Sequence, residues 1–126
     1  MDYNQNVAKL AVENENFRRE ILTGPHSQVV LMSLKPGEDI GEETHKVDQI
    51  LVFVQGFGEA VLNGVKSPVE AGSLVMVPAG TQHNFINTGE SVMKLYTVYA
   101  PAEHAPGTVH KTRAEAMAAE ELEHKQ

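Results

Sequence analysis

Six histidines are the most informative of the side chains that could bind a metal or move a proton, because the chain has no cysteine. Two of them stand out by position: His45 follows an acidic stretch, and His83 follows a Pro-Ala-Gly turn. Side chains two residues apart in extended backbone point to the same face, so Glu43 and His45 face one way. Gln49 opens an apolar run over residues 50–54 and shares that face if the intervening turn keeps the alternation. A polar side chain at the start of a buried strand costs free energy unless a partner satisfies it, and a metal ion would do so.

Glycines, a proline and polar residues recur at fixed spacings around these positions, in two segments. The first segment is Gly37-x5-Glu43-x-His45-x3-Gln49-x6-Gly56. The second segment is Gly72-x5-Pro78-x-Gly80-x2-His83-x3-Asn87. In their order, their spacing and their separation by 15 residues, the two segments resemble the two motifs of small single-domain cupins. The resemblance covers residues 28–99, which is most of the chain.

The resemblance implies an all-β fold, an antiparallel jelly-roll β-barrel that holds one divalent metal inside. The residues at its four ligand positions are Glu43, His45, Gln49 and His83. Two of them depart from the family pattern: Glu43 stands where a histidine is usual, and Gln49 stands where a glutamate is usual. Two imidazoles, one carboxylate and one amide oxygen suit zinc, iron, manganese, cobalt or nickel. With a single carboxylate ligand the bound ion keeps a net positive charge, which favours an anionic or oxygen-chelating substrate.

Each candidate residue also has a purely structural interpretation. A histidine in a sheet, or an amide at a strand end, can be satisfied by hydrogen bonds to its neighbours. Glu43 could be a solvated carboxylate like the adjacent Glu42. Outside the motifs, His104 and His110 are candidate acid–base residues over the mouth of the barrel, although loop histidines are more often ordinary surface residues. Tyr96 is a third catalytic candidate, with packing in the core or at the rim as its alternative.

The elements that would position these residues are short strands separated by turn residues, which favours a sandwich or small barrel. The expected strands are residues 17–22, 28–34, 49–54, 59–62, 65–69, 73–77, 82–86 and 92–99. A short helix is expected near residues 6–15. A second helix, residues 113–124, begins at a Thr112-x-x-Glu115 capping box and is expected to be a solvated cap on the fold. We expect one domain over residues 1–126, with an N-terminal extension (1–16), a motif core (28–99) and a C-terminal loop and helix (100–126).

Composition excludes several function classes. The chain has 126 residues, 41% hydrophobic and 21% charged, as in an ordinary globular protein. Ten basic residues against seventeen acidic ones give a formal net charge of −7, which disfavours nucleic-acid binding. The lack of cysteine excludes disulfides and thiolate metal sites. No apolar run is long enough to cross a membrane, so no membrane association and a cytoplasmic location are expected.

Three functions remain open. The first is a metal-dependent enzyme, of isomerase or lyase type, that acts on a small polyoxygenated substrate, either sugar-like or a carboxylate. The second is a non-haem iron dioxygenase in which Glu43, His45 and His83 hold the iron. The third is a non-catalytic cupin that binds a small molecule. A homodimer is expected as well, because the family commonly pairs its barrels.

Overall fold

The computed structural model describes residues 3–124, and this part of the chain forms two helices and ten strands. The helices are α1 (Val7–Glu13) and α2 (Arg113–His124). The strands are β1 (Arg18–Thr23), β2 (Gln28–Leu34), β3 (Glu43–Thr44), β4 (Asp48–Gln55), β5 (Phe57–Leu62), β6 (Val65–Glu70), β7 (Leu74–Val77), β8 (Gln82–Ile86), β9 (Met93–Ala100) and β10 (Val109–His110).

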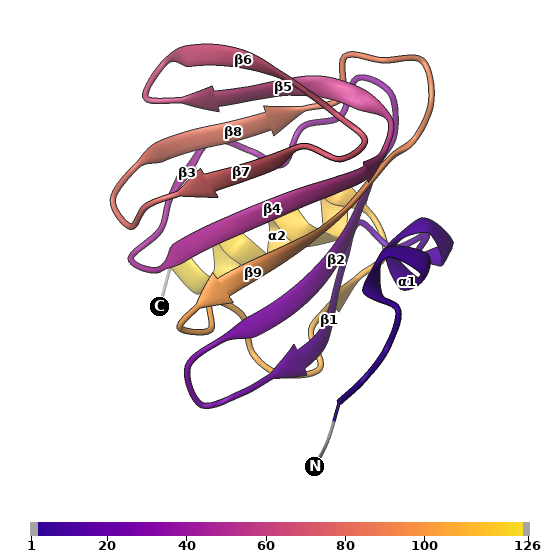
Figure 1. The fold of residues 1–126 in the computed structure, drawn as a ribbon. Coiled ribbons are helices and arrows are strands. Elements are labelled where there is room, and N and C mark those ends of the chain that lie inside the picture. The colour runs from indigo at the N-terminus through magenta and orange to yellow at the C-terminus, as the bar shows by residue number, and fades with distance from the viewer. Residues whose placement is uncertain (1–2, 125–126) are drawn as a thin grey trace.

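The strands form two sheets that face each other (Figure 1). One sheet has six strands in the order β10-β1-β2-β9-β4-β7, and the other has four in the order β3-β8-β5-β6. Every pairing is antiparallel, and strands distant in sequence, such as β2 and β9, lie side by side. This is the arrangement of a jelly roll, and it confirms the expected all-β fold with a C-terminal helix.

The expected strands are all present, with ends that differ by at most two residues. Two further strands, β3 and β10, have only two residues each, and so short a segment carries no recognisable alternation. The helix expected near residues 6–15 is α1, which begins after its N-cap residue Asn6. The expected capping box starts α2, where the Glu115 backbone N–H donates to Thr112 Oγ1 at 3.1 Å.

A two-residue turn joins β5 to β6. Its residues, Asn63 and Gly64, have φ angles of 49° and 82°, both in the left-handed region. Two consecutive positive φ angles are what a type I′ hairpin turn requires, and asparagine followed by glycine adopts them at little cost. The turn therefore fixes the register of this hairpin, in which Leu62 pairs with Val65.

The interior between the sheets has an apolar half and a polar half. In the apolar half, Met32, Leu95 and Phe53 form one row across three neighbouring strands, and Phe53 faces Phe85 of the other sheet at 5.8 Å between ring centroids. Further along the same three strands, β2, β9 and β4, the inward-facing side chains become polar. The polar half begins with Gln28, Thr97, Tyr99 and Gln49, all buried. The core that stabilises the fold and the polar groups that could do chemistry thus occupy different ends of one cavity.

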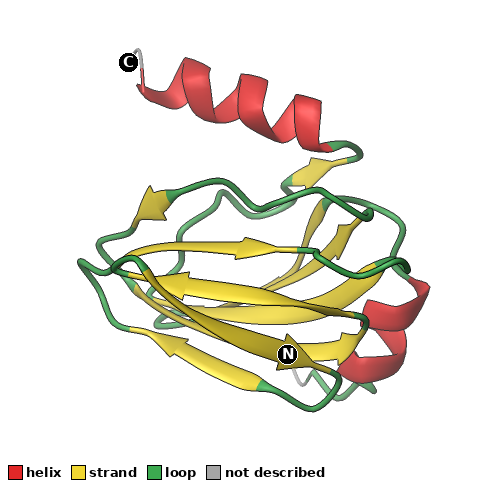
Figure 2. Ribbon diagram, turned by 90° about the horizontal axis from the view of Figure 1, so that it is seen from above, coloured by secondary structure: helices red, strands yellow, loops and turns green. Residues whose placement is uncertain are grey.

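Helix α2 lies across one side of the stacked sheets, next to the short strand β10 (Figure 2). Near its start, Arg113 pairs with Asp39 at 2.7 Å. In its middle, Ala116 is fully buried and Met117 packs against the core. Further along, Glu120 pairs with Arg18 of β1 at 3.1 Å. The helix therefore bridges β1 and the segment before β3, and it is more than the solvated cap expected from the sequence. None of the helices within residues 3–124 is long and apolar enough to span a membrane.

Candidate functional site

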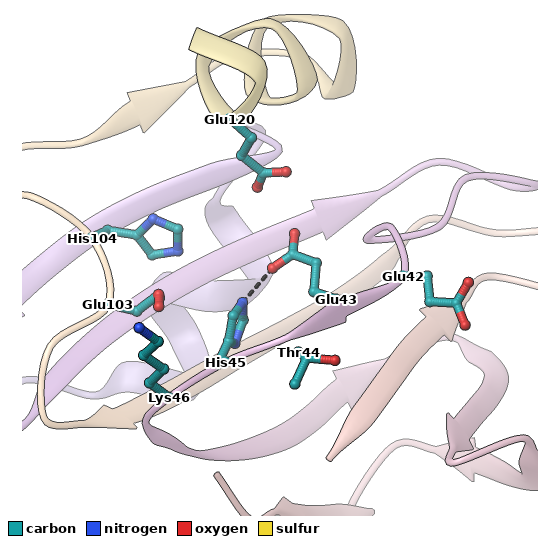
Figure 3. Close-up of a pocket in the computed structure, with 8 residues that line it drawn as sticks. All are labelled: Glu42, Glu43, Thr44, His45, Lys46, Glu103, His104 and Glu120. Carbon is teal, nitrogen blue, oxygen red and sulfur yellow. Dashed lines mark hydrogen bonds and ion pairs between the residues drawn. The ribbon is translucent and has the colours of Figure 1, made fainter. Parts of the chain in front are cut away.

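A pocket of about 400 Å³ opens at the polar end of the interior (Figure 3). Its lining residues are Glu42, Glu43, Thr44, His45, Lys46, Glu103, His104 and Glu120. They come from three separate parts of the chain: the β3 segment, the loop after β9, and α2. Two of the four expected metal ligands, Glu43 and His45, are among them.

The other two expected ligands lie close by. Strand β3 pairs Glu43 with His83 of β8, and the His45 and His83 rings are 5.0 Å apart between centroids. Gln49, on β4 of the opposite sheet, is 2% exposed and bonds to Tyr99, whose ring lies 5.8 Å from that of His45. The structure thus brings together all four residues of the motif positions.

His83 is held in one tautomer. Its Nδ1 lies 2.8 Å from the carbonyl oxygen of Thr81, which can only accept, so Nδ1 carries the proton and donates. Nε2 is then the unprotonated nitrogen. A hydrogen bond from the other ring nitrogen to a carbonyl oxygen is typical of metal-binding histidines. Burial lowers the pKa of His83, aided by the charge of His45, so the ring is neutral at pH 7, as metal binding requires.

The orientation of the Gln49 amide is fixed by hydrogen bonds. Thr97 Oγ1 donates to the carbonyl oxygen of Ile50 at 2.9 Å, so towards Gln49 it can only accept. Gln49 Nε2 donates to this oxygen at 3.1 Å and lies 3.3 Å from the Tyr99 hydroxyl. The amide oxygen Oε1 must therefore point the other way, where it is buried without a hydrogen-bond partner.

Three of the four motif residues carry a buried polar atom with no hydrogen-bond partner: Glu43 Oε1, His45 Nδ1 and Gln49 Oε1. Such atoms cost free energy unless something satisfies them. A carboxylate oxygen, an amide oxygen and an imidazole nitrogen are all metal donors, so the donor set fits a divalent cation. Within residues 3–124, however, no three histidine, aspartate or glutamate side chains are arranged around one ion, and His45 Nε2 instead contacts Glu43 Oε2 directly.

The contact between Glu43 and His45 shifts both pKa values. Burial alone would raise the pKa of Glu43, but its hydrogen bond with His45 and the charges of His45 and Arg18 lower it. Burial alone would lower the pKa of His45, but the hydrogen bond and charge of Glu43 raise it. A cation bound here would replace the proton of this hydrogen bond, so its affinity would fall as the pH is lowered.

Of the three catalytic candidates, His104 lines the pocket. Its ring packs on Tyr99 at 5.2 Å between centroids, and its Nε2 is buried without a partner. The fully buried Gln28 holds its backbone: Gln28 Nε2 donates to the carbonyl oxygen of His104 at 2.6 Å, and Gln28 Oε1 accepts from the His104 N–H at 3.0 Å. Burial and the charge of Arg18 lower the pKa of His104 to about 3, so the ring is uncharged at neutral pH.

The other two candidates lie elsewhere. His110 lies beside Arg18: its Nδ1 accepts from Arg18 Nη1 at 3.3 Å, because a guanidinium has no acceptor. Tyr96 lies between Leu95 and Thr97, whose side chains face inward, so its own side chain points away from the pocket. It lines a groove on the outer face of the larger sheet. The tyrosine of β9 that faces the site is Tyr99, in which burial raises the pKa of the phenol.

Several site residues carry no sequence signal of their own. Tyr99, Thr97 and Gln28 lie on strands whose inward and outward residues are both largely apolar, so alternation does not single them out. Arg18 and Glu120 are brought to the site by the contact of β1 with α2, two elements about a hundred residues apart. Only a three-dimensional structure could have placed them there.

Comparison with known proteins assigns the chain to a family. Residues 30–99 match the cupin domain family, and this stretch contains both motifs. Because the match spans more than half of the chain, the protein belongs to the cupins. The fold, the motif residues and the family assignment therefore agree.

Individual relatives extend the similarity beyond the motif core. The chain is 47% identical over 123 residues to the Bacillus subtilis protein YrkC; the alignment covers 92% of this chain and 66% of YrkC, so the chain spans about two-thirds of that relative. It is 30% identical to polyketide synthase CurC of Streptomyces cyaneus, over 64% of this chain and 53% of CurC. Among solved structures, BH2720 of Bacillus halodurans superimposes with a TM-score of 0.92 and 41% identity, covering 94% of this chain and 95% of BH2720.

Proposed function

We propose that this cupin binds one divalent metal and is an enzyme, of isomerase or lyase type, for a small polyoxygenated molecule. The observation that carries the proposal is the set of unpartnered buried atoms on Glu43, His45 and Gln49, at three of the four positions where cupins hold a metal. The fourth residue, His83, supports it with an unprotonated Nε2. The similarity to CurC, a polyketide synthase by name, favours an enzyme over a binding module.

The four motif residues share one task in the proposed site, and neighbouring residues support them. Glu43, His45, Gln49 and His83 would hold the metal, which supplies Lewis acidity for polarising oxygen atoms of the substrate. Thr97 and Tyr99 hold Gln49 in the orientation that exposes its oxygen. Gln28 fixes the loop that carries His104, so that this neutral ring can hydrogen-bond a bound molecule.

The pocket itself supports a small polar substrate. Its volume of about 400 Å³ is that of a small-molecule site, and carboxylates, imidazoles and one lysine make up most of its lining. Such a surface suits hydroxyl and carbonyl oxygens better than an extended apolar chain. Lys46 is the only lysine or arginine among the described residues of the lining, and no phosphate-binding motif accompanies it.

A second candidate function is that of a non-haem iron dioxygenase. Glu43, His45 and His83 have the composition of the two-histidine, one-carboxylate triad that holds iron in such enzymes. In support, Glu43 pairs with His83 across the strands, and the His83 ring lies 5.0 Å from that of His45. Metal identity separates the two functions, because zinc has no accessible redox step. Iron at one equivalent per chain would move the proposal to oxygenase chemistry.

The test is metal content. Protein purified without added metal is analysed for transition metals, and its affinity for zinc is measured by competition with a chromophoric chelator. His45→Ala and His83→Ala should each lose tight binding while the sheets stay folded, and the exposed His26→Ala should match the parent chain. A full equivalent of metal in both site variants would contradict the proposed centre. A parent chain that binds no divalent ion would leave the non-catalytic binding function in its place.

We further propose a homodimer formed by the outer face of the larger sheet. Two rows of apolar side chains cross this face in register: Val29, Val98, Ile50 and Met76 in one, and Tyr96, Val52 and Leu74 in the other. Leu74 and Met76 are 63% and 41% exposed. Contiguous apolar side chains on a sheet face mark an interaction surface, and a second copy would present the same rows.

A further inference from the structure

Two unpartnered buried atoms at the site are not explained by a metal. Among the described residues, five buried side-chain polar atoms have no hydrogen-bond partner, and three of them belong to the proposed metal ligands. The remaining two are Arg18 Nε and His104 Nε2. A guanidinium nitrogen always carries hydrogen and stays charged, so Arg18 cannot be a metal ligand. It is a buried donor that lacks an acceptor.

Arg18 is buried and does not itself line the pocket, which it meets through its ion pair with Glu120. Its side chain is 1% exposed, and its guanidinium lies 5.6 Å from the ring of Phe17. Its Nη1 donates to Glu120 Oε1 at 3.1 Å and to His110 Nδ1 at 3.3 Å. Taking a guanidinium out of water costs several kcal/mol unless an anion lies against it. Glu120 is the carboxylate that the structure places there.

Glu120 is a poor permanent partner for Arg18. It lines the pocket from α2, 19% exposed, and its carboxyl group points toward that of Glu43 (Figure 3). Two carboxylates that point toward each other repel each other. Glu120 contacts Nη1, which is not part of the donor fork formed by Nε and Nη2, so Arg18 keeps an edge that could hold another carboxylate with two hydrogen bonds.

We propose that Arg18 is the carboxylate-binding residue of this pocket, and that Glu120 of α2 competes for its charge with the carboxylate of an organic acid. The inference rests on the proposed function in one respect: the carboxylate and the oxygens at the metal position belong to the same ligand. It narrows the substrate class to acids, such as hydroxy acids or sugar acids. His104, beside Arg18, then offers its unpartnered Nε2 to the same ligand.

The surroundings of Arg18 favour a carboxylate over a phosphate. The group that Arg18 already holds is a carboxylate, and one guanidinium matches one carboxylate in charge and in its fork of donors. A phosphate would bring about two negative charges. It would meet the carboxylates of Glu42, Glu43 and Glu103 in the lining, where Lys46 is the only lysine or arginine among the described residues.

Chemical rescue tests the carboxylate site directly. Glu120→Ala removes the carboxylate from Arg18 and should lower the midpoint of thermal unfolding. Acetate should restore about 3 °C of it, while acetamide and chloride at equal ionic strength should not. Glu121→Ala, one residue further along the exposed side of α2, is the control and should show no difference between acetate and acetamide. Equal effects of acetate and acetamide on Glu120→Ala would overturn the proposal.

A matched pair of ligands tests the site with larger molecules. Galacturonate and galactose differ chiefly in one carboxylate. Glu120→Ala should bind galacturonate roughly tenfold more tightly than the parent chain does, with galactose unchanged, because the competing carboxylate is gone. Glu120→Gln removes the charge but keeps the shape of the side chain, and it should show the same preference. A gain in this variant shows that the lost charge, and not altered packing of α2, is the cause. No gain for galacturonate in either variant would contradict the role of Arg18.

Zinc affinity, measured on the same samples, separates this inference from the proposed function. Zinc binding is measured on the parent chain and on Glu120→Ala, and the proposed function requires that the parent chain binds it. If neither protein binds zinc while acetate still rescues Glu120→Ala, the metal centre is refuted and the carboxylate site stands. If zinc binds and acetate has no specific effect, the metal centre stands and the carboxylate site is refuted.

Discussion

Gln49 occupies the motif position at which cupins usually carry a glutamate, and a neutral amide has to be oriented before its oxygen can serve in place of a carboxylate. A carboxylate presents an oxygen whichever way it is turned, whereas a reversed amide would present N–H groups to a cation. Thr97 removes this ambiguity, because its hydroxyl hydrogen is used on the Ile50 carbonyl and its oxygen accepts from Nε2. Thr97, on the neighbouring strand β9, therefore compensates for glutamine in place of glutamate at position 49, because it fixes the orientation of the amide.

This arrangement predicts the effect of Thr97→Val. Without the hydroxyl, the amide of Gln49 loses the acceptor that selects its orientation, and zinc affinity should fall by roughly tenfold or more. Thr97→Ser keeps the hydroxyl and should retain the affinity of the parent chain. Chelator competition gives both values, and circular dichroism checks that each variant is folded. Unchanged affinity in Thr97→Val would show that Gln49 does not need Thr97.

The buried, neutral His104 predicts a dependence of stability on pH. In the unfolded chain a histidine binds a proton near pH 6.5, whereas folded His104 does so near pH 3. Between these values the unfolded state holds more protons, so the free energy of unfolding contributed by His104 falls as the pH drops, by about 1.4 kcal/mol per pH unit. His104→Gln should reduce this slope in urea unfolding between pH 6 and pH 4. The exposed His26→Gln is the control, and an equal slope in His104→Gln and the parent chain would contradict the prediction.

At the level of single residues, the sequence predicts the motif positions of the site but not the contacts between their side chains. The positions of Glu43, His45, Gln49 and His83 could be predicted because motif spacing encodes them along the chain. The contact between Glu43 and His45, and the choice of Tyr99 over Tyr96, depend on which face of a strand lies inward. Strand β9 alternates between two largely apolar faces, so its sequence does not reveal that choice.

At the level of elements, strands of four residues or more could be predicted from apolar runs and turn residues, but the packing of α2 could not. The sequence of α2 is rich in alanine and glutamate, a composition typical of a solvated helix. Its docking depends on a few side chains that meet distant partners: Arg113 with Asp39, Ala116 with the core, and Glu120 with Arg18. Such long-range pairs leave no periodic pattern in a sequence.

The docking of α2 can be tested with two alanines on opposite sides of the helix. Ala116 is fully buried and Ala118 is exposed. Ala116→Asp would bury an unpaired carboxylate, so α2 should detach, and its backbone amides should exchange hydrogen with solvent faster. Ala118→Asp should leave exchange unchanged. In both variants the amides of β2, β4 and β9 should stay protected, and an undisturbed α2 in Ala116→Asp would show that the helix is held by other contacts.

At the level of the whole molecule, the outer face of the larger sheet predicts the oligomeric state. Val52→Lys places a charge in the middle of the two apolar rows and should convert a dimer into a monomer, because a buried charge without a partner opposes association. Val65→Lys is the control, since Val65 is 71% exposed on the smaller sheet. Sedimentation equilibrium gives the mass of each. A dimer that persists in Val52→Lys would place the interface elsewhere.

The two halves of the interior also bear on how such a protein can evolve. Stability resides mainly in the apolar rows that contain Phe53 and Phe85, whereas recognition and chemistry would reside in the polar rows and in α2. Substitutions at distant, independent sites have nearly additive effects, so a change of ligand at one end costs the other end little. A lineage of such chains can therefore exchange donor residues, as glutamine for glutamate at position 49, or remodel its C-terminal helix, without rebuilding the scaffold. This separation gives a physical basis for many activities arising on one fold.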